Sequence, residues 1–316
     1  MDTSLKENLI SYLGRNLRRI FELLEPLRYD RMEEIRLRVG KPILVIINGK
    51  EYALTEKGKL LADDISLGYR PVKEDISAAM ELISGYSPYA FEDELKNGYI
   101  TIPGGHRVGL VGRAVLNGRS VKTITNISGM NIRVSRQIEG CGDEVYPRIV
   151  KPELFHAMII SPPACGKTTL LRDLIRQLSY GRAGFSHGLT VGVVDERSEL
   201  AGCYRGIPQN DLGPRTDVLD GCPKAEGMLM LLRSMAPKVI AVDEIGKRED
   251  IEAIEDIMNA GVKLICTVHG HNPEEVARRL PSLWEKHVFG RYVVLKGPGK
   301  IDCIYDKNLK PVGGAL

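Results

Sequence analysis

The pattern of apolar residues differs between the two halves of the chain, and it is more regular in the second half. The apolar runs LFHAMIIS, LTVGVVD, KVIAVDEIG and VKLICTV have the length of buried strands. Between and after them, apolar residues recur every three or four positions, which predicts helices over residues 168–180, 224–235 and 272–280. GRYVVLK and KIDCIYD predict a closing hairpin. Strands that alternate with helices are typical of a parallel sheet, so an α/β domain is expected over residues 149–316.

The first 148 residues show a mixed pattern, which predicts a smaller α+β domain. Helical spacing extends over residues 4–25 and again over residues 73–85. Strands are expected in EEIRLRVGKPILVIINGKEY, with a tight turn at Asn48-Gly49, and in GYITIPGG, HRVGLVGRAV, SVKTITN and residues 131–138. A proline-bearing connection over residues 146–152 leads to the second domain, where residues 200–223 form the one long irregular stretch.

The run IISPPACGKTTLL combines a strand, a short turn and the start of a helix. A phosphate chain needs converging backbone N–H groups, a lysine ammonium and the positive end of a helix dipole, and this run supplies them in that order. Ser161 stands where the usual phosphate loop has glycine, and a serine can follow a strand into a turn. Thr168 supplies a hydroxyl for Mg²⁺. The candidate nucleotide-binding residues are Ser161, Pro162, Pro163, Ala164, Cys165, Gly166, Lys167, Thr168 and Thr169.

A second candidate motif is the end of KVIAVDEIG, where four apolar residues lead into Asp243 and Glu244. In open α/β sheets, ligands bind at the carboxyl ends of the strands, where these two carboxylates are expected. Two adjacent acids at a strand end also occur by chance. Together with the phosphate loop upstream, the functional interpretation is favoured: Asp243 orients Mg²⁺ and Glu244 polarises the attacking water.

Composition narrows the classes of function. With 316 residues, 43% hydrophobic and 27% charged, the chain has the composition of a globular protein with room for two domains. Its net charge of +3 is too small to indicate nucleic-acid or membrane binding by itself. No apolar run has the length of a membrane span, and MDTSLKENLI lacks the apolar core of a signal peptide, so a cytoplasmic location is expected. The six cysteines show no CxxC spacing, which argues against a structural zinc site.

Three further stretches resemble the ATPases that power type II and type IV secretion and pili, which are RecA-like P-loop NTPases. MLMLLRSMAPKVIAVDEIG resembles their arginine-bearing helix and Walker B strand, TVHGHNPEEVARRL their His box, and VVDERSEL their Asp box. GYITIPGGHRVGLVG, upstream of NIRVSRQI, adds a resemblance to the stage III sporulation branch of this superfamily. The resemblance covers nearly the whole chain.

The resemblance implies a RecA-like ATPase that binds ATP and Mg²⁺ between the subunits of a homo-hexameric ring. It places phosphates and Mg²⁺ at Lys167, Thr168 and Thr169, and γ-phosphate sensing at His269. The Asp box adds candidates that position Mg²⁺ or water, although the usual Glu-Asp order is reversed: Asp195, Glu196 and Glu199. Many relatives have glycine where this chain keeps Asp243.

Charge that develops on a transferred phosphoryl group calls for a guanidinium, often from a neighbouring subunit. Arg133 matches the strand arginine of the related ATPases, and Arg107 is the next candidate.

The resemblance implies integral membrane proteins of the same sporulation operon as partners. The chain would join the membrane through them and energise a transport channel between mother cell and forespore. Two alternatives stay open, a nucleic-acid-stimulated ATPase and a nucleotide-gated scaffold. The chain has no basic patch interleaved with aromatic residues, so a nucleic-acid partner is not expected.

Overall fold

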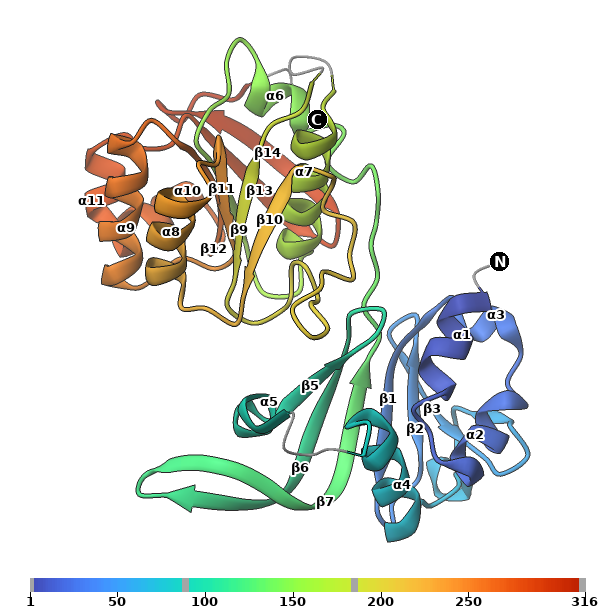
Figure 1. The fold of residues 1–316 in the computed structure, drawn as a ribbon. Helices are drawn as coiled ribbons and strands as arrows, with labels where there is room; N and C mark the ends of the chain where they lie inside the picture. Colours follow the sequence, from blue (N-terminus) through green and yellow to red (C-terminus); the bar gives the residue numbers. More distant parts are fainter. Residues whose placement is uncertain (1–2, 87–90, 183–186, 313–316) are drawn as a thin grey trace. The chain divides into compact units, whose positions relative to one another are not determined.

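The computed structural model describes residues 3–86, 91–182 and 187–312 and divides into two compact units (Figure 1). These are the N-terminal unit, Met1–Arg136, and the C-terminal unit, Gln137–Leu316. The division lies before the expected boundary at residue 148. Each unit has its own seven-stranded sheet and its own buried core.

The C-terminal unit is built on a sheet with the strand order β10-β9-β11-β12-β8-β13-β14. Its first six strands run parallel, and only β14 pairs antiparallel, through the predicted hairpin with β13. The strands are β8 (Ala157–Ser161), β9 (Val191–Asp195), β10 (Thr216–Asp220), β11 (Val239–Val242), β12 (Lys263–His269), β13 (Arg291–Gly297) and β14 (Lys300–Asp306).

Helices cover both faces of this sheet (Figure 1). On one face, the apolar side of α7 and the residues of α6 form a core with the strands. On the other face, α8, α9, α10 and α11 form a second core. The helices are α6 (Tyr146–Val150), α7 (Lys167–Tyr180), α8 (Lys224–Ser234), α9 (Arg248–Asn259), α10 (Pro273–Arg279) and α11 (Pro281–Glu285). Asn272 caps α10 as its sequence predicts, because its side chain accepts a hydrogen bond from the Glu275 N–H at 2.8 Å.

The sheet order decides where the functional loops meet. Strand β12 lies between β11 and β8, and all three run in the same direction. Their carboxyl ends therefore lie along one edge of the sheet, with His269 of β12 in register with Ser161 of β8. The phosphate loop, the acidic pair after β11 and the His box after β12 are neighbours for this reason.

The N-terminal unit is an antiparallel sheet with the order β4-β3-β2-β1-β7-β6-β5. Asn48 and Gly49 both have positive φ, +50° and +71°, which is the backbone of the tight turn predicted between β2 and β3. The strands are β1 (Met32–Arg38), β2 (Leu44–Ile47), β3 (Lys50–Leu54), β4 (Leu60–Leu61), β5 (Tyr99–Ile102), β6 (His106–Asn117) and β7 (Ser120–Arg133). The helices are α1 (Thr3–Ile10), α2 (Arg15–Glu22), α3 (Pro26–Tyr29), α4 (Lys73–Ile83) and α5 (Glu92–Asn97), with a 3₁₀ turn over Ile65–Leu67.

The structure corrects the prediction of one helix over residues 4–25. The helix is broken between α1 and α2, where Gly14 has ψ 160° and lies against α4. A Cβ on Gly14 would lie only 2.7 Å from the Cβ of Ala78. The apolar spacing is shared by two helices that fold back on the same core, so periodicity alone did not detect the break.

Three further expectations differ from the structure. Residues 131–138 do not form a separate strand, because residues 120–133 are one continuous strand that pairs with both β6 and β1. The connection over residues 146–152 begins with helix α6. The stretch 200–223 contains β10, a half-buried edge strand whose sequence TDVLD alternates polar and apolar residues too briefly to stand out.

Candidate functional site

The phosphate loop connects β8 to α7 over residues 162–166. Ser161 ends the strand fully buried, and its hydroxyl donates to the Pro162 carbonyl at 2.8 Å. Ala164 and Gly166 have φ of +59° and +86°, so the loop turns twice through left-handed backbone before the helix begins at Lys167. Such alternation turns successive N–H groups to one side, which is the geometry of an anion-binding nest at a helix N-terminus.

Thr168 and Asp243 meet at the mouth of this loop. The Thr168 hydroxyl donates to Asp243 Oδ2 at 2.7 Å, although the two residues lie 75 positions apart. The other carboxylate oxygen of Asp243 accepts a hydrogen bond from the buried hydroxyl of Thr267 on β12. A hydroxyl and a carboxylate oxygen are the hard donors that Mg²⁺ prefers, so these two side chains fit a magnesium ion that also binds phosphate oxygens.

Glu244, His269 and Lys167 form a chain of contacts beside that pair. The Nε2 of His269 lies 2.9 Å from Glu244 Oε1, and the Lys167 ammonium lies 3.2 Å from His269 Nδ1. The Lys167 ammonium also lies 3.3 Å from His269 Nε2, so the imidazole ring contacts both the lysine and the Glu244 carboxylate. Glu244 has φ +59°, and its backbone N–H donates to the Thr267 hydroxyl at 2.8 Å. The second carboxylate oxygen of Glu244 pairs with Arg197 at 3.1 Å.

Asp195 has a different environment from the other candidate carboxylates. It is buried, and its oxygens accept backbone N–H groups of Glu199, Leu200 and Ala201 at 2.8, 3.0 and 2.8 Å. Burial raises the pKa of Asp195 to about 6, and the three N–H donors oppose that rise. With its acceptors engaged in this way, the side chain fixes the fold of the loop that follows β9.

The two glutamates of this loop are also engaged. Glu196 pairs with the buried ammonium of Lys224 and lies 3.9 Å from Lys247, and these cations help to lower its pKa despite partial burial. The backbone carbonyl of Glu199 accepts from Arg172 of α7 at 2.6 Å, which ties the loop to the helix of the phosphate site. The catalytic roles suggested for Asp195, Glu196 and Glu199 stay predictions.

Arg107 and Arg133 belong to the N-terminal unit, where they occupy paired positions on β6 and β7. The Arg107 guanidinium stacks on the Tyr99 ring at 3.5 Å, and Arg133 is mostly exposed, 4.0 Å from Glu34. The assignment of either arginine to a nucleotide site stays a prediction.

A cavity of about 500 Å³ lies directly beside the phosphate loop. Its wall includes Ala164 and Gly166 of the loop and the β13–β14 turn, whose Gly299 N–H points to the Cys165 carbonyl at 3.4 Å. Apolar side chains complete the lining: Ile138, Leu170, Leu295 and Ile301. A phosphate-type loop that opens onto an apolar cavity fits a ligand with a charged end and a flat apolar end.

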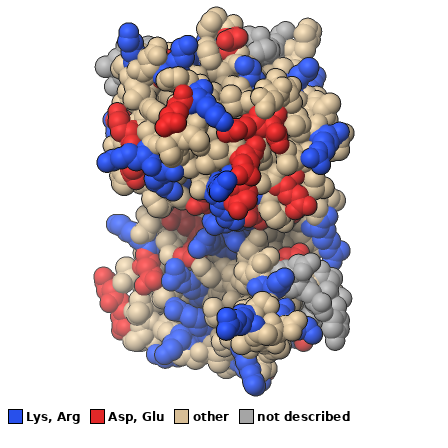
Figure 2. Space-filling model, turned by 90° about the vertical axis from the view of Figure 1, so that its left-hand side faces the viewer, with Lys and Arg blue, Asp and Glu red and all other residues tan. Residues whose placement is uncertain are grey.

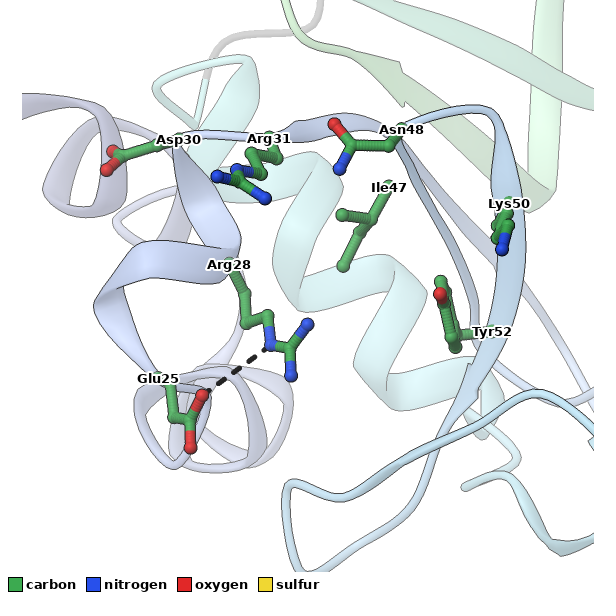
Figure 3. Close-up of a pocket in the computed structure, with 8 residues that line it drawn as sticks. All are labelled: Glu25, Arg28, Asp30, Arg31, Ile47, Asn48, Lys50 and Tyr52. Carbon is green, nitrogen blue, oxygen red and sulfur yellow. Dashed lines mark ion pairs between the residues drawn. The ribbon is translucent and has the colours of Figure 1, made fainter.

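A larger cavity, about 770 Å³, lies within the N-terminal unit beside α3 and the β2–β3 hairpin (Figure 3). Its cations are opposed by carboxylates: Arg28 pairs with Glu25 at 3.6 Å, and Asp30 lies at the same site. Arg31 and Lys50 are both exposed to solvent. The near balance of charges makes this cavity a poorer phosphate site than the loop after β8.

Two residues of the site were missed by reasoning from sequence. Thr267 links Asp243 to Glu244, and its only sequence signal was its place in TVHGHN. Arg197 pairs with Glu244. It lies among the acidic residues of VVDERSEL, and nothing in that pattern distinguishes it from a surface arginine.

A parallel sheet with a phosphate-type loop after β8 and an acidic pair after β11 defines the class of the C-terminal unit, a RecA-like α/β fold. Two solved structures share this fold with the chain. The ATPase DotB of Legionella pneumophila superposes with a TM-score of 0.55 at 16% identity, over 94% of this chain and 77% of that one. The pilus retraction motor PilT, solved with bound ADP, gives 0.55 at 16% identity, over 83% and 74%.

The family follows from sequence comparison. A model of the family described as Sporulation stage III, protein AA, matches residues 3–312. Stage III sporulation protein AA of Bacillus subtilis (strain 168) is 44% identical over 282 residues, which are 88% of this chain and 87% of that protein. The chain belongs to the sporulation stage III protein AA family.

Proposed function

We propose that this protein hydrolyses ATP at the carboxyl edge of the C-terminal sheet. The observation that carries the proposal is the convergence of five side chains from three neighbouring strand ends: Lys167, Thr168, Asp243, Glu244 and His269. Lys167 and the loop N–H groups bind the phosphates, and the adjoining apolar cavity takes the adenine ring. When bound, Mg²⁺ neutralises phosphate charge, and Thr168 and Asp243 would hold it.

Glu244 orients the attacking water and accepts its proton in this proposal. Its backbone is fixed by the Thr267 hydroxyl and its carboxylate lies between His269 and Arg197. His269 contacts both the lysine and the glutamate, so it is placed to report the phosphate end of the ligand to the base. Positioning and electrostatic stabilisation are the main sources of catalysis in phosphoryl transfer.

The finer role follows the family. We infer that the chain acts as a homo-hexameric ring in which an arginine of the neighbouring protomer, Arg133 before Arg107, completes each site. The ring would work at the membrane through integral proteins of the same sporulation operon and energise a channel between mother cell and forespore. Within the described part of the chain, no helix is both long enough and apolar enough to cross a bilayer.

The test is ATP turnover measured against protein concentration. Sites completed by a neighbour give a specific activity that rises cooperatively with concentration, and Arg133→Ala removes that rise while nucleotide binding persists. Lys167→Ala abolishes both binding and turnover because the phosphates lose their ammonium. Turnover of Lys167→Ala and Glu244→Ala at the wild-type rate would refute ATP hydrolysis at this site. A concentration-independent rate in the wild type would refute the shared site alone.

A further inference from the structure

The distal part of the β6–β7 hairpin has a charge pattern unlike the rest of the chain. No Asp or Glu occurs between residues 95 and 138, a stretch that contains the whole hairpin. The hairpin carries five cations, three of them in its distal half: Arg113, Arg119 and Lys122. Over the whole chain, acids and bases are nearly balanced, with 44 Lys and Arg against 41 Asp and Glu. This local excess predicts attraction to an anionic surface.

The same segment projects from the N-terminal sheet (Figure 1). Every residue from Val111 to Ser120 is exposed. The projection begins at a bulge beside Gly112, where a Cβ would lie 2.6 Å from the Thr125 carbonyl oxygen and where Asn126 has φ +47°. We call residues 112–126 the arm. Glycine is required at its base because the two strands approach too closely there for any side chain.

The arm has one apolar and one polar face. Residues that pair across an antiparallel ribbon share a face. The pairs Ala114–Ile124 and Leu116–Val121 therefore place four apolar side chains on one face, with Lys122 at the bulge opposite Leu116. Arg113–Thr125 and Val115–Thr123 lie on the other face. Leu116, at the tip, is 61% exposed. A two-stranded ribbon with an open apolar face gains stability only when that face is covered.

We propose that the arm binds an anionic lipid bilayer, with its apolar face in the headgroup–acyl boundary and its cations on lipid phosphates. Figure 2 shows the side of the N-terminal unit towards which the arm points, where Lys and Arg are spread among uncharged side chains and some Asp and Glu. A short apolar face flanked by cations matches the two signals that hold a peripheral protein on such a membrane. Nucleic acid is disfavoured, because the arm contains no aromatic residue for base stacking. The proposal is independent of ATP hydrolysis.

The test is sedimentation of the full chain with vesicles, without nucleotide. Vesicles of equal parts phosphatidylglycerol and phosphatidylcholine are expected to bind it and phosphatidylcholine vesicles are not, and binding falls as salt is raised. Replacing the three arm cations by Gln lowers the affinity on the order of 100-fold, since each contributes roughly fivefold near an anionic surface. Leu116→Ser lowers it roughly tenfold because it removes apolar surface from the boundary.

The matched controls use the same unit outside the arm. Lys41, Lys57 and Lys59 are exposed cations, and their combined replacement by Gln removes the same net charge. Leu67→Ser alters a side chain that is 63% exposed. Both controls are expected to bind like the wild type. No vesicle binding at low salt, or equal loss in arm and control variants, overturns the proposal. Loss of single-stranded DNA binding in the arm variants, without any vesicle binding, assigns the arm to nucleic acid and overturns it too.

Discussion

Thr267→Val replaces a fully buried hydroxyl by a methyl group of nearly the same shape. The hydroxyl donates to Asp243 and accepts from the Glu244 N–H at 2.8 Å, so valine leaves one carboxylate oxygen and one backbone N–H without this partner. A partly buried donor or acceptor left unpaired costs about 1–3 kcal/mol. We therefore expect the free energy of unfolding of the C-terminal unit to fall by about 2–4 kcal/mol.

The same substitution tests the proposed reaction. Freed from Thr267, Asp243 and Glu244 lose the contact that fixes their relative position, and outer contacts of this kind are worth roughly 10–100-fold in activity. Urea unfolding measures the stability, and steady-state ATP turnover with nucleotide titration separates kcat from binding. Thr267→Ser is the control, because it keeps both hydrogen bonds and loses one methyl group, at about 1 kcal/mol. Equal free energies of unfolding and equal kcat values for the valine and serine variants would show that the Thr267 hydroxyl stabilises neither Asp243 nor Glu244.

Three shorter predictions concern Glu244, His106 and Cys165. Glu244→Gln keeps nucleotide binding but lowers turnover about 100-fold or more, since the amide cannot accept a proton; equal turnover would exclude Glu244 as the base. Burial lowers the pKa of His106 to about 4, so the unfolded chain takes up a proton between pH 6.5 and 4 that the folded chain does not. Stability from His106 is complete above pH 6.5 and falls by about 3 kcal/mol towards pH 4, a slope that His106→Gln should reduce in urea unfolding. Maleimide on Cys165, inside the phosphate loop, blocks nucleotide binding, Mg-ATP protects the thiol, and Cys165→Ala is insensitive.

The parallel sheet, and the edge of it that carries the candidate site, could be predicted because buried strands and a phosphate loop leave strong local signals. IISPPACGKTTLL and KVIAVDEIG each contain the strand, the turn and the polar residue that define their place. The order of the strands could not be predicted in this way, because no local sequence pattern indicates that β12 lies between β8 and β11. That order places Thr267 against Asp243. Gly14, which precedes α2, likewise has no room for a side chain because of Ala78, on another element. Contacts that join distant segments were the part that periodicity could not supply.

Asp243 connects the phosphate loop to Glu244, the proposed base, through a chain of hydrogen bonds. One of its oxygens accepts from Thr168, at the start of α7, and the other from Thr267, which in turn accepts the Glu244 N–H. Any ligand that engages the Thr168 hydroxyl competes with Asp243 for it, and a shift of that carboxylate acts on Thr267 and so on the backbone of Glu244. A glycine at this position would break this chain of contacts. Asp243→Gly should therefore alter turnover more than nucleotide affinity, because Lys167 and the loop N–H groups remain.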